Sequence, residues 1–211
     1  MKFIFILLAI CSAISTQGME TAKLLNGHES TALLEKKCIQ TTVSGVIAPR
    51  WDISLQMLSQ PDFIQWIQTE YQRSVSKDGT VGCPIVEAGE GQYYYLNQKK
   101  QRTDIFELHR DQTSDTTFDL IYLAKGKRFF GKYEVLIHVH VIDAGAAGTV
   151  YTAGIHAYPN NGPLRFLARR MGSVERYFQN KTKLIADITG QICTGMQTAG
   201  EFTLLSSQAS L

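Results

Sequence analysis

The longest regular pattern of apolar positions in the chain runs from Ser173 to about Met196. Its apolar residues recur every three or four positions, the spacing of one helical face. They are Val174, Phe178, Ile185, Ile188, Ile192 and Met196. Gly190 and Gly195 each cost about 1 kcal/mol of helix stability relative to alanine. Either packing against other elements stabilises this helix, or another group approaches it closely at the glycines. The pattern predicts one long amphipathic helix near the C-terminus.

The first half of the chain alternates between strand-like and helix-like patterns. Cys38 to Ala48 is rich in β-branched residues and stops at Pro49, which indicates a strand. Two short amphipathic helices are expected next, over Trp51–Leu58 and from Asp62 to about Tyr71, separated by a break at Pro61. Residues 74–91 contain glycine, serine and proline and are expected to form a loop.

Residues 92–158 read as a series of strands joined by turns. The expected strands are Gln92–Gln98, Thr103–Arg110, Thr116–Ala124, Arg128–Ile142 with a bulge at Gly131, and Thr149–Tyr158. Residues 125–127 are expected to form a turn and residues 143–148 a hairpin loop. An antiparallel sheet usually needs one covered face. The expected fold is therefore α+β, a curved antiparallel sheet wrapped around the long C-terminal helix, with two short helices after the first strand.

The N-terminus has the pattern of a secretory signal peptide: Lys2, an apolar run of about 11 residues, then small and polar residues. Cleavage is expected after Ser15 or Gly18, and the protein is expected to be exported, to a periplasm or outside the cell. Cys11 leaves a lipoprotein interpretation open, although Ile10 is larger than the residue that usually precedes a lipidated cysteine. Residues 19–36 are expected to be a flexible leader, residues 37–198 one ligand-binding domain, and residues 199–211 a disordered tail.

Composition narrows the function further. The chain has 211 residues and a net charge of +2, and its one basic cluster is Arg165, Arg169 and Arg170, so we expect no nucleic-acid partner. That cluster would allow a transient contact with a membrane surface. Without the signal peptide, Cys38, Cys83 and Cys193 remain; two of them could pair in an oxidising compartment, and the sequence does not choose the pair.

The pattern resembles the START-like, or helix-grip, superfamily over about residues 38–197. Three segments carry the resemblance: Val43–Pro49 with the helix that follows it, the tryptophan-bearing segment Phe63–Trp66, and Tyr133–Tyr158 followed by Val174–Met196. The superfamily includes lipid-transfer domains, polyketide cyclases, plant pathogenesis-related proteins and coenzyme Q-binding proteins. The resemblance implies that one apolar molecule binds between the sheet and the helix. It carries over no catalytic residue, because the superfamily has no invariant catalytic signature.

Seven residues are the candidates for contact with such a ligand. The apolar and aromatic ones come from the strands and from the helix, and two histidines would provide a polar cavity floor. They are Phe106, Tyr122, His138, His140, Tyr151, Phe178 and Ile185. For any one of the aromatic or apolar residues, ordinary core packing is the simpler interpretation.

The histidine pair also leaves a second function open. His138 and His140 lie two residues apart, so their imidazoles share one face of a strand, and a third ligand within reach would allow a metal. The pair resembles the paired histidines of cupins, but the glutamate that should follow is replaced by Ala144 and Gly145.

The function that we expect is therefore an exported, monomeric binding or carrier protein for a hydrophobic, lipid-like molecule, without catalysis, cofactor or metal. One alternative is a cyclase-like or metal-dependent enzyme that uses His138 and His140 in the same cavity. A second alternative is a structural or interaction protein with a filled core.

Overall fold

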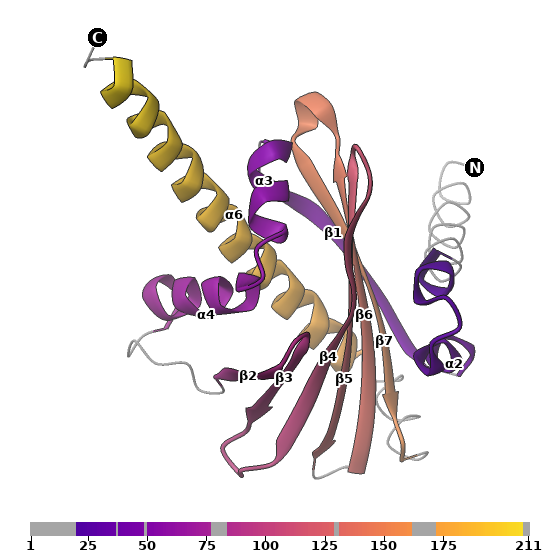
Figure 1. The fold of residues 1–211 in the computed structure, drawn as a ribbon. Helices are drawn as coiled ribbons and strands as arrows, with labels where there is room; N and C mark the ends of the chain where they lie inside the picture. Colours follow the sequence, from indigo (N-terminus) through magenta and orange to yellow (C-terminus); the bar gives the residue numbers. More distant parts are fainter. Residues whose placement is uncertain are drawn as a thin grey trace.

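The computed structural model describes residues 20–36, 38–48, 50–76, 84–128, 131–161 and 172–208. Within these ranges the chain forms a seven-stranded antiparallel sheet with helices on both sides (Figure 1). A helix over residues 20–25 comes first. The remaining elements are η1 (Glu29–Thr31), α2 (Ala32–Glu35), β1 (Ile39–Ala48), α3 (Trp51–Leu58), α4 (Phe63–Ser74), β2 (Ile85–Gly89), β3 (Gln92–Leu96), β4 (Arg102–Ser114), β5 (Thr117–Arg128), β6 (Gly131–Asp143), η2 (Gly145–Ala147), β7 (Thr149–Pro159) and α6 (Ser173–Gln208). The predicted α+β class is confirmed.

The strand order is β1-β7-β6-β5-β4-β3-β2, so the first strand of the chain pairs with the last. β6 pairs with β5 and with β7 along its length without a register shift, so it is a regular interior strand of the sheet. The helix α6 lies mainly along β1, an edge strand, and also contacts α3 and α4. The edge strand β1 is thus covered by a helix, a common protection against pairing with another chain.

The two faces of the sheet have different partners. We call the face toward α3, α4 and α6 the inner face, and the face toward residues 20–35 the outer face (Figure 1). On the inner face, Phe118 and Leu120 of β5 are buried with Met57 of α3 and Cys193 of α6. β5 alternates as its sequence pattern predicts, because side chains repeat every two residues in a strand.

The N-terminal segment is a layer of the fold, and the expectation of a flexible leader over residues 19–36 is wrong for the part that the structure describes. Leu25 and Leu33 are 6% and 3% exposed, and they pack with Ile121 and Leu123 on the outer face. The prediction failed because the segment looks polar along the chain, while its few leucines all turn toward the sheet. Residues 1–19, including the expected signal peptide, lie outside the described residues.

Three turns or ends differ from the sequence-based expectation. Residues 125–127 belong to β5, because Gly126 lies opposite Tyr133, and a Cβ at Gly126 would overlap the Tyr133 hydroxyl. The glycine therefore permits a close approach inside a strand, and β5 continues to Arg128. The expected loop at 74–91 contains the strand β2, and β6 begins at Gly131, whose φ is 105°.

The long helix is confirmed, and most of the large apolar residues expected on one face of it do pack inward. Ile188 is 1% exposed, and Phe178, Ile192 and Met196 pack against the buried clusters, so Ile185 is the exception. Ile185 is 48% exposed, whereas Ala186, Thr189 and Cys193 are buried. Small side chains face β1 because helix and strand approach closely there. The backbone of α6 continues to Gln208, so the part of the expected disordered tail that the structure describes is helical. Within the described ranges, no helix combines the length and apolarity needed to cross a bilayer.

Candidate functional site

The structure divides the seven predicted ligand-contacting residues among three places. Tyr122, Tyr151 and Phe178 lie on the inner side, in the clusters formed by the sheet and the helices. The other four do not join them: Phe106, His138 and His140 point to the outer face, and Ile185 points to solvent. Sequence analysis assigned all seven to one cavity. The alternation of residues along a strand separates its two faces, but it does not say which face is the interior. Their role in ligand binding stays a prediction.

The inner face is covered less completely than the outer face at the middle of the sheet. Ile137 and Val139, on the central strand β6, point inward and are only partly buried, as is Ile105 on β4. Their outward-pointing neighbours Leu136 and His138 are 0% exposed. Central apolar positions of a sheet beneath a helix are normally the most buried ones. The protein's own side chains therefore leave apolar surface uncovered between the sheet and α6.

A polar cluster lies on this inner face where β4 and β5 meet the start of α4. The Tyr122 hydroxyl donates to Glu107 Oε2 at 2.8 Å, and Arg110 Nη2 lies 2.8 Å from the same carboxylate. Arg110 also donates to the Gln60 carbonyl at 2.5 Å, and its guanidinium lies 5.3 Å from the centre of the Phe63 ring. The cluster thus ties the sheet to the segment between α3 and α4.

A bulge places Glu107 and Arg110 on the same face. The β4–β5 register shifts between Glu107 and His109, so that Glu107 pairs with Tyr122 and Arg110 pairs with Leu120. Two residues three positions apart in a regular strand would point to opposite faces, and one extra residue corrects the parity. Sequence analysis found neither Arg110 nor Glu107, because an uninterrupted alternation along this strand gives no reason to place them together.

The charges within the cluster cancel, and one hydrogen-bond donor of Arg110 has no partner among the described residues. Glu107 and Arg110 carry opposite charges, and burial raises the pKa of Tyr122 well above its ordinary value, so the phenol is neutral. Arg110 Nε is buried and has no hydrogen-bond partner among the described residues. Such a group suits the polar end of a mostly apolar molecule, because leaving a buried donor unpaired costs about 1–3 kcal/mol.

A groove runs along the outside of the interface between β1 and α6. One part, about 450 Å³, is lined by Thr42–Val46 with Tyr151 on the sheet side and by Asn180, Lys183 and Asp187 on the helix side. A second part, about 590 Å³, shares Val46, Ala186 and Asp187 with the first and continues to Thr194. Burial first, and then the charge of Asp187, raises the pKa of Tyr151. The groove is open and partly polar, unlike the apolar surface at the middle of the inner face.

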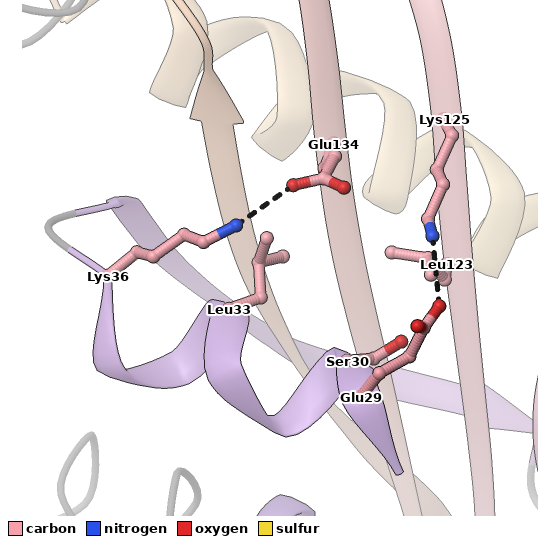
Figure 2. Close-up of a pocket in the computed structure, with 7 residues that line it drawn as sticks. All are labelled: Glu29, Ser30, Leu33, Lys36, Leu123, Lys125 and Glu134. Atoms are coloured by element: carbon pink, nitrogen blue, oxygen red, sulfur yellow. Dashed lines mark hydrogen bonds and ion pairs between the residues drawn. The ribbon is translucent and has the colours of Figure 1, made fainter.

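A small cavity on the outer face marks the seam between the N-terminal segment and the sheet (Figure 2). Its volume is about 170 Å³, below the roughly 300 Å³ at which cavities usually begin to hold small-molecule ligands. Lys36 pairs with Glu134 at 3.2 Å, and Lys125 pairs with Glu29 at 3.5 Å, so each lysine is neutralised by a carboxylate across the seam. These pairs position η1 and α2 on β5 and β6.

The histidine pair forms a second polar cluster on the outer face. His138 Nε2 and His140 Nδ1 each lie 2.7 Å from Asp119 Oδ1. Burial raises the pKa of Asp119, but hydrogen bonds from both histidines and from Thr113 outweigh it, and the pKa falls well below its ordinary value. The Asp119 hydrogen bond raises the pKa of His140. The expected polar floor of the inner cavity is therefore not formed by these histidines.

Two of the three cysteines considered in the sequence analysis lie in the part of the chain that the structure describes. Cys38 and Cys193 are both buried, but they belong to clusters on opposite faces of the sheet and are not bonded to each other. Cys83 and the basic residues Arg165, Arg169 and Arg170 lie outside the described residues. His156 pairs with Leu136, and its side chain is on the outer face.

Comparison with known proteins reveals likeness at the level of the fold only. No family model and no curated protein matches the chain. Similar solved structures include a hypothetical protein from Helicobacter pylori, 10% identical over 73% of this chain and 86% of that one, with a TM-score of 0.49. A conserved protein from Geobacillus kaustophilus is 15% identical over 70% and 90%, with a TM-score of 0.42. A START superfamily protein from Mycobacterium smegmatis is 13% identical over 75% and 97%, with a TM-score of 0.38.

Proposed function

We propose that the protein binds one mostly apolar, lipid-like small molecule between the inner face of the sheet and α6, and that it does so without catalysis. The observation that carries this proposal is the partial exposure of Ile137 and Val139 in the middle of the sheet. Their neighbours along β6, Leu136 and His138, point to the outer face and are fully buried. A filled core would bury Ile137 and Val139, whereas a ligand would cover them. Burying apolar surface contributes roughly 25 cal/mol per Å².

The cluster of Arg110, Glu107 and Tyr122 would position the polar end of the ligand. The Arg110 Nε–H is buried without a partner among the described residues, so an acceptor on the ligand would satisfy it. Because Glu107 already compensates the guanidinium charge, the site favours a neutral group, such as a hydroxyl, ester or ketone, over a free carboxylate.

Binding can be tested on the full chain with native mass spectrometry and a fluorescent long-chain fatty alcohol. We expect a co-purified or added apolar molecule at one per protein. Val139→Phe should fill the uncovered space and lower the affinity for the probe at least roughly tenfold, the effect of losing about 1.4 kcal/mol of binding free energy. The matched control is Val86→Phe on β2, where the side chain is 42% exposed and away from the inner face's centre.

The outcome that rejects the proposal is equally specific. If the wild-type chain binds no probe, or if Val139→Phe and Val86→Phe bind it equally well while both keep the wild-type circular dichroism, the inner face is not the binding site.

Export is part of the same proposal and rests on the N-terminal sequence pattern alone. A carrier for a poorly soluble molecule is useful in an aqueous compartment outside the membrane. Either expected cleavage position, after Ser15 or after Gly18, leaves the layer of residues 20–35 in the mature chain. N-terminal sequencing of protein recovered from its native host tests this: an uncut Met1 would argue against export.

A further inference from the structure

The outer face of the sheet carries histidines from three strands, and two of them meet one carboxylate. Four of the five histidines of the chain point to this face: His109 on β4, His138 and His140 on β6, and His156 on β7. Asp119, on β5, lies opposite His140 in the register. This is the third ligand that two histidines on one strand lack by themselves.

We propose that Asp119, His138 and His140 form a binding site for one divalent transition metal ion of the Zn²⁺ class. One ligand atom from each residue lies within 4.8 Å of the other two. Two imidazoles and one carboxylate are a common ligand set for Zn²⁺ and for other first-row divalent ions. The site is on the opposite side of the sheet from the proposed ligand cavity and does not depend on it.

The surroundings of the three ligands match those of metal sites. His138 offers Nε2 to the site, while its Nδ1 lies 2.7 Å from Thr21 Oγ1. Asp119 offers Oδ1, while Thr113 donates a hydrogen bond to Oδ2 at 2.5 Å. Two of the three ligands thus have a second partner on the far side that fixes their orientation, and metal sites regularly have such partners. Thr21 and Thr113 come from elements far apart in the chain.

The proton balance of metal binding is simple. In the metal-bound form, His138 Nε2 and His140 Nδ1 carry no proton, so each neutral imidazole keeps its proton on the other nitrogen. For His138 that nitrogen already faces a hydroxyl oxygen able to accept. For His140 the side chain is 17% exposed, so water can accept.

The geometry requires only a small opening. Ligand atoms about 2.0–2.1 Å from a tetrahedral Zn²⁺ lie roughly 3.3 Å from one another. The two nitrogens are each 2.7 Å from Asp119 Oδ1, so each of these distances must open by about half an ångström, and the two nitrogens, which lie within 4.8 Å of each other, must come to about the same 3.3 Å.

Two other histidines of this face each have a buried ring nitrogen without a hydrogen-bond partner among the described residues, His109 Nε2 and His156 Nδ1. His156 is 8% exposed, and its Nδ1 is buried without a hydrogen-bond partner among the described residues. It lies on the strand next to His138 and on the same face, two positions from the residue opposite His138. A buried imidazole nitrogen without a partner is costly, which indicates that a group is missing from this region.

The test uses the full chain freed of metal with a chelator and then titrated with Zn²⁺ against a chromophoric competitor. We expect one ion per chain with a dissociation constant below roughly 10 μM, together with a rise in the melting temperature. Substituting Co²⁺ should produce the visible absorption of a low-coordinate site. His140→Gln and Asp119→Asn should each lower the Zn²⁺ affinity by roughly 100-fold or more, since changes to second partners alone cost 10- to 100-fold.

Two further variants keep the test decisive. His109→Gln removes a histidine from the same face and should leave the affinity unchanged. Thr21→Val keeps all three ligands and should lower the affinity roughly tenfold or more, while the stoichiometry stays at one. The proposal is overturned if the wild-type chain binds no Zn²⁺ in this range, or if folded His140→Gln protein binds it as tightly as the wild type.

Discussion

Arg110 and Glu107 are three residues apart on one strand, yet both side chains reach the inner face of the sheet. The bulge between Glu107 and His109 accounts for this, and bulges often re-aim side chains next to binding sites. A single extra residue therefore decides whether both side chains of this pair lie on the inner face. The same bulge leaves His109 on the outer face with His138, His140 and His156.

Cys193 is a residue whose chemistry is suppressed by its position. It is 1% exposed in the inner cluster, and burial raises the pKa of its thiol to about 11. At pH 8 roughly one thiol in a thousand is then ionised, against about one in ten at the ordinary value, and only the thiolate is reactive.

We therefore predict that Cys193 resists iodoacetamide at pH 8 in the native protein and reacts readily in 6 M guanidinium. Mass spectrometry of the peptide that contains Cys193 measures both rates. Native alkylation at the unfolded rate would show that α6 does not bury Cys193 against α3 and the sheet in solution.

The helix α6 depends on a row of small side chains. Gly190 lies where the helix crosses β1, and a Cβ added there would overlap the carbonyl oxygen of Ile47. Gly195, one and a half turns later, has no atom within 4 Å of such a Cβ. The two glycines look alike in the sequence, but one permits close packing and the other does not take part in it.

This difference predicts opposite effects of one substitution. Gly195→Ala should stabilise the protein by up to about 1 kcal/mol, because alanine favours a helix by that amount. Gly190→Ala should instead destabilise it by about 1–3 kcal/mol, because the new methyl group would overlap the Ile47 carbonyl, and shifting the backbone of β1 costs free energy. Urea denaturation of both variants measures the free energies of unfolding. Stabilisation by Gly190→Ala would mean that α6 does not cross β1 as closely as the structure has it.

In the molecule as a whole, the sheet is a central layer with a helical layer on each side (Figure 1). α3, α4 and α6 cover the inner face, and residues 20–35 cover the outer face through Leu25, Leu33 and the ion pairs at the seam. A sheet with both faces covered can hold a polar cluster away from water on either side. Here the inner layer leaves apolar surface uncovered, while the outer layer closes over Asp119 and His138.

If the N-terminal layer belongs to the cooperative core, shortening one of its buried side chains should destabilise the whole protein. Leu33→Ala should cost about 2–4 kcal/mol of unfolding free energy, the usual cost of such a cavity. Leu33 is 3% exposed, whereas the control position, Leu96 on β3, is 45% exposed and should change the free energy by less than about 0.5 kcal/mol.

Urea denaturation followed by circular dichroism compares the two variants. Equal stability of Leu33→Ala and Leu96→Ala would indicate that residues 20–36 fray independently of the sheet.

Much of the architecture was predictable because it follows from the short-range periodicity of apolar and polar residues. β1, α3, α4, the β5 alternation and the long helix α6 follow from patterns that repeat within ten residues or so. Of the seven candidate ligand contacts, Tyr122, Tyr151 and Phe178 lie on the inner side, where all seven were expected. The Arg110 cluster was not found, because its parity depends on a bulge, and a bulge depends on the neighbouring strand.

The sequence by itself determined the class of fold and the order of the elements, since hydrophobic spacing and turn residues act locally. Only the tertiary structure decided which face of the sheet is the interior and which residues meet. Thr21 and His138 are 117 positions apart and form one hydrogen bond, and Asp119 joins two histidines from another strand. Such contacts depend on strand register and on the packing of distant segments, and no local pattern encodes them.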